Sequence, residues 1–184
     1  MTNQELILDL KQDVEQLIAE TQTRFSVLNK EMVQRKPEEH SWSIEQCFAH
    51  LCSYNAHYNA AFRKALQHAK SGSPQSLHRR TFLGKLCIKA VHPDNIGKKM
   101  KAIARHNYID KPIDGNVIER FLAYQYELLE LLDLAKDKDL QKTKVNIEIA
   151  KWLKLNLGDF FYFLIYHEKR HVLQASRVLE KINR

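Results

Sequence analysis

Four long segments in which apolar residues recur at helical spacing constrain the fold of this chain most. In residues 3–31, for example, Leu6, Leu10 and Val14 stand four positions apart, which places them on one face of a helix. Glycine and proline, with 5 and 4 copies in 184 residues, are too scarce for a protein built on many tight turns. The chain is therefore expected to fold into long amphipathic helices that bury their apolar faces against one another.

Three further helices are expected, and local signals mark their ends. Ser41 or Ser43 can cap the second helix, because a serine hydroxyl accepts a hydrogen bond from the first free amides of a helix. The sequence Ser-Gly-Ser-Pro ends that helix, and Gly158 stands near the start of the last one. These three helices are expected at residues 43–71, 116–136 and 157–182.

The segments between these helices are shorter or irregular. Residues 77–112 combine one short helix, around LGKLCIKAV, with turns and extended connections. The polar linker 137–146 leads into a short helix or an extended piece before the last helix. We therefore predict an all-α fold, an antiparallel four-helix bundle with a long crossover segment between helices 2 and 3, which occupies residues 1–184 as a single domain.

Composition indicates a cytoplasmic protein with no membrane partner. No run approaches the roughly 18 uninterrupted apolar residues of a membrane span, and the N-terminus lacks the basic-then-apolar pattern of a signal peptide. Cys47, Cys52 and Cys87 form no Cys-x-x-Cys pair, and their odd number disfavours a disulfide framework. They are expected to be buried as small apolar side chains, with a mixed metal site of Cys47 and His50 as the alternative.

The net charge of +7 is concentrated in residues 79–111. Such a basic segment could bind nucleic acid, but it holds no recognisable binding motif, and Phe82 and Tyr108 are too few aromatics for a stacking platform. A solvated basic face is the alternative. The only acidic residues of the segment are Asp94 and Asp110. Its basic residues are Arg79, Arg80, Lys85, Lys89, Lys98, Lys99, Lys101, Arg105 and Lys111.

The sequence HEKRH in the last helix predicts a metal site. His167 and His171 are four residues apart, so both imidazoles lie on one helix face and can bind one ion. His50 and His57 share the apolar stripe of the second helix. Burying three imidazoles without partners would cost several kcal/mol, and a shared ion bound by His50, His167 and His171 removes that cost. For any single histidine, a hydrogen-bonded place in the core is the alternative.

The other histidines are expected on the surface, because they fall in loops, at helix ends or among charged residues. They are His40, His68, His78, His92 and His106.

HEKRH also matches the His-Glu-x-x-His signature of zinc peptidases, with Glu168 in the place of the general base. Those enzymes need a third ligand, which usually follows the motif. The residues after His171 contain no histidine, and Glu180 lies about 13 Å further along the same helix. The peptidase interpretation is therefore disfavoured.

Tyr54, His57 and Glu168 are the candidates for acid or base catalysis near this site. Tyr54 and His57 follow His50 by one and two turns on the same stripe. Glu168 is rotated away from both histidines of the last helix, so pairing with a surface lysine is the alternative. Gln174 faces the same way as His171 and can orient a ligand.

Two segments of the chain resemble motifs of the DinB-like superfamily. SWSIEQCFAHL, which ends just after His50, is similar to the first motif of that family, and FFYFLIYHEKRHVLQASRVL is similar to the last. The resemblance implies a four-helix bundle whose metal ligands are His50 from the second helix and His167 and His171 from the fourth. It also implies a long variable connection between helices 2 and 3, a homodimer, and kinship with transferases that use bacillithiol or mycothiol.

Three classes of function follow from these features. Three neutral imidazoles leave open positions on a zinc or nickel ion, the pattern of a catalytic site, so the first is a metal-dependent transferase or hydrolase. Its substrate would be a small molecule, such as a low-molecular-weight thiol. The second is a non-catalytic metal-binding accessory of a stress response. The third is a nucleic-acid-binding protein that uses residues 79–111.

Overall fold

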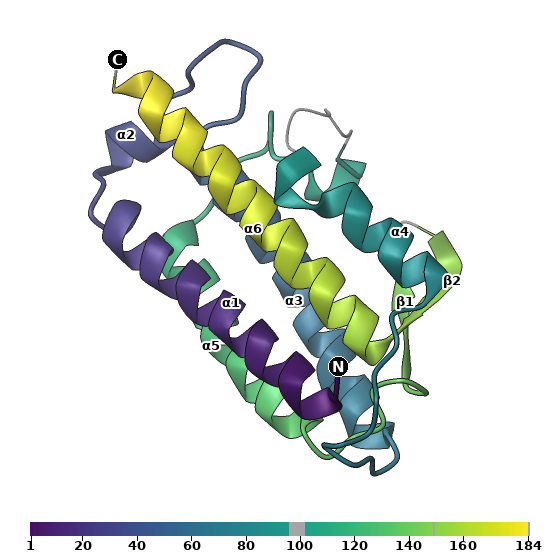
Figure 1. The fold of residues 1–184 in the computed structure, drawn as a ribbon. Helices are drawn as coiled ribbons and strands as arrows, with labels where there is room; N and C mark the ends of the chain where they lie inside the picture. Colours follow the sequence, from purple (N-terminus) through teal and green to yellow (C-terminus); the bar gives the residue numbers. More distant parts are fainter. Residues whose placement is uncertain (96–101, 149, 184) are drawn as a thin grey trace.

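Four long helices form the body of the computed structural model, which describes residues 1–95, 102–148 and 150–183 (Figure 1). α1 packs against α5 and α6, and α3 packs against the same two helices. The prediction of a mostly helical, bundle-like fold is therefore confirmed. The four helices are α1 (Asn3–Arg24), α3 (Ile44–His68), α5 (Val117–Ala135) and α6 (Leu157–Ile182).

Polar side chains begin each long helix. Thr2 and Glu5 form a capping box at α1, and Ser43 and Gln46 form another at α3. Ser43, rather than Ser41, is thus the cap of the second long helix. Asn116 and Asn156 accept hydrogen bonds from the first free amides of α5 and α6.

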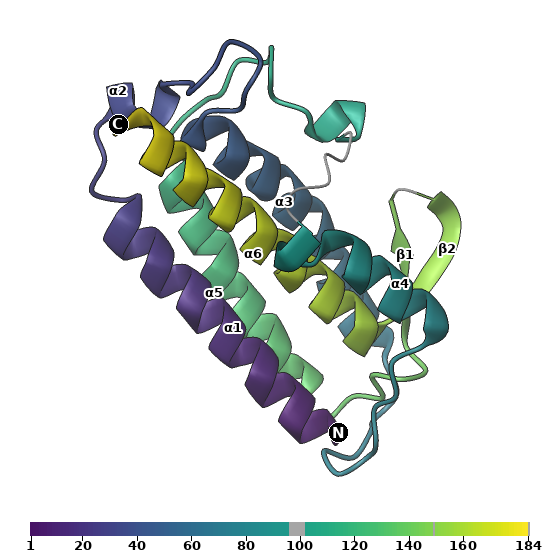
Figure 2. The ribbon, with the colours of Figure 1, turned by 45° about the horizontal axis from the view of Figure 1, so that its top comes forward.

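Smaller elements surround the bundle (Figure 2). The short helix predicted around LGKLCIKAV is α4, which packs on the outer side of α6. β1 and β2 pair antiparallel, with Val145 opposite Leu155, and β1 also contacts α3. These elements are α2 (Lys30–Gln34), α4 (Phe82–Val91), the 3₁₀ turns η1 (Pro93–Asn95) and η2 (Ala104–His106), β1 (Lys144–Ile147) and β2 (Ala150–Asn156).

The structure corrects two of the predicted elements. The first helix was expected to reach residue 31 but ends at Arg24, because Phe25 turns into the core and Asn29 caps the separate helix α2. The prediction of a purely helical fold is wrong at β1 and β2. In β1, Val145 and Ile147 are buried while their neighbours are exposed, the two-residue period of a strand.

No helix among the described residues is long and apolar enough to cross a membrane.

The core holds large aromatic side chains between the helices. Phe48 contacts Phe25 and Phe121 edge to face, with ring centroids 5.1 and 5.2 Å away. Phe62 packs edge to face against Phe160 and is tilted by 32° to the Phe161 ring.

A buried polar cluster joins the start of α6 to the segment before α4. The side chains of His78 and Asp159 are both fully buried, with His78 Nε2 3.3 Å from Asp159 Oδ1. Asp159 Oδ2 accepts hydrogen bonds from the Thr81 amide, the Thr81 hydroxyl and the Asn156 side chain, at 3.0, 2.7 and 3.1 Å. The surface position expected for His78 is therefore wrong, because a charged partner compensates its burial.

Gly84 and Gly158 leave room for this cluster. A Cβ atom at position 84 would overlap the Asp159 carboxylate, and one at position 158 would overlap the His78 ring. Several hydrogen bonds hold Asp159, and the His78 side chain is fully buried, so neither can move aside cheaply.

Gly84→Ala is accordingly expected to lower the free energy of unfolding by about 1–3 kcal/mol, the usual cost of overpacking a core. Urea denaturation followed by circular dichroism measures this. Lys85→Ala, at the exposed neighbouring position, serves as the control and is expected to change stability by less than about 0.5 kcal/mol. Equal stability of the two variants would contradict the packing described for Gly84.

Candidate metal centre

The start of α3 fixes the position of His50. The capping box of Ser43 and Gln46 sets where the helix begins, and His50 follows about two turns later on the buried side. The Gln46 amide nitrogen also donates hydrogen bonds to the carbonyl oxygens of Tyr108 and Ile109, at 3.0 and 2.9 Å. The beginning of α3 is thereby fastened to the segment that passes over the histidines.

The structure brings His50, His167 and His171 together between α3 and α6. One ring nitrogen from each of the three lies within 4.8 Å of the other two. The Nε2 atoms of His50 and His167 are 3.3 Å apart, and the His171 ring centroid lies 4.4 Å from that of His50 and 4.6 Å from that of His167. His50 and His167 are buried and His171 is half-buried. Among the described residues, this is the one group of three or more potential ligands that is close enough to hold a metal.

Hydrogen bonds orient two of the three rings. His50 Nδ1 lies 2.7 Å from the His106 carbonyl oxygen, which only accepts, so this nitrogen donates its proton. His171 Nδ1 likewise donates to Gln174 Oε1, at 2.9 Å. In both residues Nε2 is left with a free lone pair, as a metal ligand requires, and His50 Nε2 faces His167 within the cluster. Gln174, which was expected to orient one of the ligands, therefore contacts His171.

His167 is held by packing, since its Nδ1 atom is buried without a hydrogen-bond partner among the described residues. Its ring lies 4.6 Å from Tyr54 and stacks at 12° on Phe163. Trp42 closes another side, 5.0 Å from the His50 ring and stacked at 22° on His171. Aromatic side chains thus flank the three imidazoles on several sides.

Burial keeps the three imidazoles neutral. It lowers the pKa of His50 and His167 well below the ordinary value, and the neighbouring His171 adds to the effect in both. Burial also lowers the pKa of His171 to about 4, although its hydrogen bond to Gln174 opposes the change. Neutral imidazoles with free lone pairs are the form that binds divalent metal ions, so this donor set fits such an ion.

The three predicted acid–base residues occupy different surroundings. Tyr54 lies against the cluster, with its ring 4.9 Å from that of His50, and burial raises its pKa. His57 is 37% exposed and stands 3.9 Å from Glu148 Oε2, outside the group of three. Glu168 is fully buried, so the alternative of a surface lysine partner is wrong.

Glu168 points into the bundle core. Its Oε1 atom accepts hydrogen bonds from Asn55 and Gln125, at 2.8 and 3.2 Å, whereas Oε2 has no partner among the described residues. Burial raises the pKa of Glu168 to about 7, with the two amide donors opposing the shift. The peptidase interpretation finds no support here, because this carboxylate is engaged by core amides from α3 and α5.

Two residues next to the site, His106 and Glu148, were not predicted from the sequence. His106 is fully buried, contrary to its expected surface position, and contacts the Ser53 hydroxyl at 2.6 Å and Glu148 Oε2 at 2.7 Å. Tyr54 packs on its ring at 3.9 Å. Glu148 also pairs with Arg105 at 2.6 Å. Neither residue belongs to a periodic pattern in the sequence, because His106 lies in a 3₁₀ turn and Glu148 follows β1.

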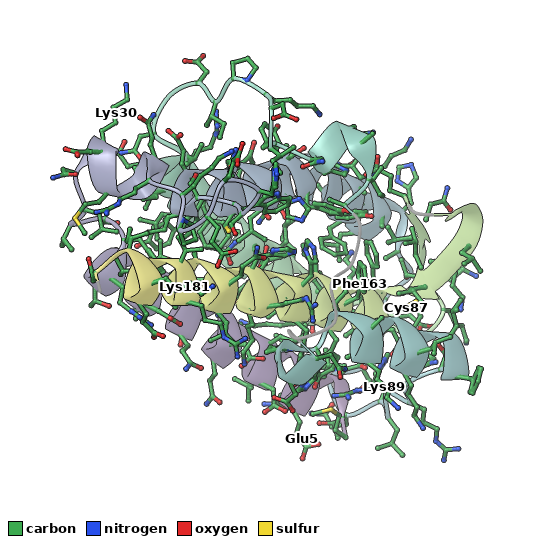
Figure 3. The ribbon with its side chains drawn as sticks, turned by 90° about the horizontal axis from the view of Figure 1, so that it is seen from above. Glu5, Lys30, Cys87, Lys89, Phe163 and Lys181 are labelled. Atoms are coloured by element: carbon green, nitrogen blue, oxygen red, sulfur yellow. The ribbon has the colours of Figure 1, made fainter. Side chains whose placement is uncertain are left out.

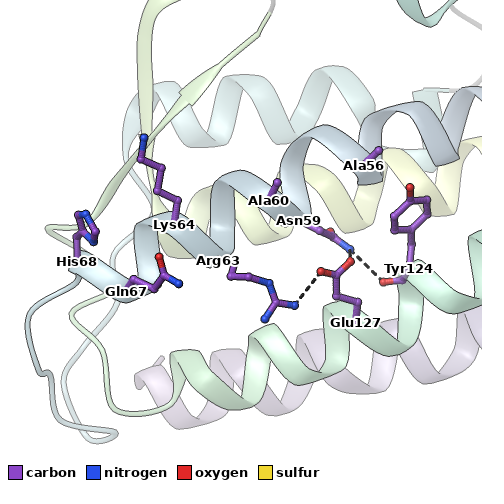
Figure 4. A pocket seen from close by; sticks show the side chains of 9 residues that line it. All are labelled: Ala56, Asn59, Ala60, Arg63, Lys64, Gln67, His68, Tyr124 and Glu127. Carbon is purple, nitrogen blue, oxygen red and sulfur yellow. Dashed lines mark hydrogen bonds and ion pairs between the residues drawn. The ribbon is translucent and has the colours of Figure 1, made fainter.

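One hollow of the described structure lies away from the histidines. It measures about 560 Å³ and lies between α3 and α5 (Figure 4). Glu127 joins two of the residues that line it: Arg63 contacts this carboxylate at 2.8 Å, and Asn59 donates to it at 3.0 Å. Because no histidine of the cluster lines it, this hollow is not part of the candidate site.

The basic segment is only partly a free surface. Lys111 donates to the carbonyl oxygens of Ala104 and Arg105, and Arg105 pairs with Glu148, so these two cations are engaged locally. Arg79, Lys85 and Lys89 are exposed. Lys98, Lys99 and Lys101, which also entered the nucleic-acid hypothesis, lie outside the described residues.

No curated protein sequence matches this chain. Its structure is similar to that of YfiT from Bacillus subtilis, described as a probable metal-dependent hydrolase with an unusual four-helix bundle topology. The TM-score is 0.57 at 13% identity, over 96% of this chain and 87% of the other, so the likeness shows a shared fold. The family model of the DinB superfamily matches residues 13–175, which include all three histidines, and this chain belongs to that superfamily.

Proposed function

We propose that this protein is a divalent-metal-dependent enzyme that activates water or a small thiol for attack on a small electrophilic molecule. The observation that carries the proposal is the convergence of three neutral imidazoles, two of which donate through Nδ1 and so keep the Nε2 lone pair free for a metal. The description of YfiT as a probable metal-dependent hydrolase supports the same class of chemistry.

The proposed ligands are His50, His167 and His171, and zinc or nickel suits imidazole donors best. When bound by three neutral ligands, such an ion keeps open coordination positions and lowers the pKa of a water molecule or thiol there. The chain contributes the fixed ring orientations and an aromatic enclosure formed by Trp42 and Tyr54. Removing water from the site strengthens every electrostatic interaction within it.

Tyr54 is the side chain we assign to contact with the substrate. It packs against His50 and His167, and its hydroxyl has no hydrogen-bond partner among the described residues. The raised pKa of Tyr54 keeps the hydroxyl protonated, so it can donate to the oxygen or other atom that gains negative charge during attack.

Tyr54→Phe is expected to lower kcat by about tenfold to a thousandfold, the range for loss of a donor to a developing anion, while bound metal stays at the wild-type level. Steady-state kinetics and metal analysis of the same samples measure both quantities. Tyr126→Phe removes a half-exposed tyrosine hydroxyl on α5 and should leave kcat unchanged. Equal losses in the two variants would contradict the role of Tyr54.

The proposal is tested with metal-loaded, full-length protein and a panel of substrates. One set pairs low-molecular-weight thiols with alkylating electrophiles, and a second set contains esters and amides. We expect turnover in one set that chelators abolish and that His50→Ala lacks. Thiol consumption would identify a transferase, and hydrolysis without thiol would identify a hydrolase. If metal-loaded wild type never exceeds His50→Ala on either set, a non-catalytic metal-binding role replaces the enzymatic one.

A further inference from the structure

The outer face of α4 presents apolar side chains to solvent. Phe82 is 86% exposed, more than any other large apolar residue that the structure describes, and Leu86 is 57% exposed. The two stand four residues apart and lie on one face. The opposite face, with Gly84, Ile88 and Val91, is buried against the bundle. Packing within this chain therefore accounts for the inner face of α4 and leaves the outer face without a partner.

Positive charges surround the exposed pair. At about 100° per residue, Lys85 and Lys89 fall on the same side of the helix as Phe82 and Leu86. Viewed from above, α4 lies at the edge of the molecule, with the labelled Lys89 on its outer side (Figure 3). Arg79 and Arg80 precede the helix, and residues 77–92 contain no Asp or Glu, so the segment carries a formal charge of +4 from its four cations.

These cations are not neutralised locally. Among the described residues, none of the four forms an ion pair, and Arg80 instead lies over the Tyr162 ring at 4.0 Å. A second copy packed α4 against α4 about a two-fold axis would bring two such positive faces together, which charge repulsion opposes. Nucleic acid would match the charge but would leave Phe82 and Leu86 without an apolar partner. The occupant must be both anionic and apolar.

We propose that α4 docks this protein on the surface of an anionic membrane. Phe82 and Leu86 enter the boundary between headgroups and acyl chains, and Arg79, Lys85 and Lys89 contact lipid phosphates. An amphipathic helix with aromatic and leucine side chains flanked by lysines binds bilayer surfaces in this way. Such contact requires no spanning helix, so the proposal departs from the expectation of no membrane partner, which rested on the lack of a spanning segment.

This inference is independent of the metal centre, and vesicle co-sedimentation of the full-length protein tests it. We expect binding to vesicles of phosphatidylcholine mixed with phosphatidylglycerol, and little binding to phosphatidylcholine alone. Raising the salt from about 0.1 M to about 0.5 M should weaken the binding, because it screens charges at the surface. Two double variants should each lower the partition coefficient to about a tenth or less. One is Phe82→Ser with Leu86→Ser, and the other is Lys85→Glu with Lys89→Glu.

The matched control is Leu8→Ser with Leu134→Ser, which removes two half-exposed leucines from α1 and α5. It should bind vesicles within about twofold of wild type. All altered positions are exposed, and thermal unfolding checks that each variant remains folded. The proposal is overturned if wild type ignores anionic vesicles, or if the control loses as much binding as the α4 variants. It is also overturned if the α4 changes instead abolish self-association or duplex DNA binding while vesicle binding is unaffected.

Discussion

His167→Ala is expected to lower the affinity of the protein for Zn²⁺ by about a hundredfold or more. The variant removes one of three ligands from a closed cluster, and no other histidine, cysteine or carboxylate of the described residues forms part of that cluster. Loss of a residue that only orients a ligand already lowers metal affinity by about tenfold to a hundredfold. Loss of a ligand itself should therefore lower the affinity further. Competition with a chromophoric chelator at fixed pH measures the dissociation constant.

His57→Ala is the matched control for this measurement. His57 lies on the same helix as His50 and the sequence placed it on the same stripe, yet it is 37% exposed and faces Glu148. Its removal is expected to leave Zn²⁺ affinity within about twofold of wild type. A loss in His57→Ala as large as that in His167→Ala would show that the ligands are not the three that converge in the structure.

Asp159→Ala is expected to be strongly destabilising, by about 3–5 kcal/mol in the free energy of unfolding. The carboxylate is fully buried, and its loss would leave His78 and the donors from Thr81 and Asn156 without their shared acceptor. Asp133→Ala is the control, because that carboxylate is 45% exposed and pairs with Lys11 on the surface. It should cost less than about 1 kcal/mol. Urea denaturation curves that give equal costs would contradict the role of the buried cluster.

The same cluster predicts how stability depends on pH. Burial favours the neutral form of Asp159, but hydrogen bonds from His78 and Thr81 outweigh it and hold the pKa of this carboxyl below its ordinary value of 3.8. A carboxyl whose pKa is lower in the folded state stabilises the fold above its unfolded pKa and loses that effect as the pH falls through its folded pKa. The stability difference between wild type and Asp159→Asn should therefore be constant near neutral pH and shrink below about pH 4. A difference that grows on acidification would contradict this account.

Local signals in the sequence were sufficient to predict the four long helices, apart from the end of the first, and the convergence of three histidines. Ser43 begins α3 by accepting a hydrogen bond three residues away, and His167 and His171 share a face because of helix geometry alone. His50 could be added because it stands on an apolar stripe, where an unpaired imidazole would be costly. Each of these inferences depends on residues that are close in the chain.

The features that the sequence did not reveal depend on partners far along the chain. His78 is buried because Asp159, 81 residues later, accepts its hydrogen bond, and His106 is buried between Ser53 and Glu148. Glu168 lies in the core because Asn55 and Gln125 donate to it from two other helices. From the sequence alone, each of these polar side chains is expected on the surface. Each can be buried because the fold brings a hydrogen-bond partner from a distant part of the chain next to it.

The central claim is that His50, His167 and His171 bind a divalent metal ion, and X-ray absorption spectroscopy of the zinc-loaded, full-length protein tests it most directly. We predict scattering from three imidazole nitrogens at about 2.0–2.1 Å, completed by a light oxygen ligand, and no sulfur. The imidazole scattering should be lost in the His50→Ala, His167→Ala double variant. A zinc–sulfur distance near 2.3 Å, which would implicate a cysteine such as Cys47, or a shell of oxygen ligands without imidazole scattering would contradict the claim.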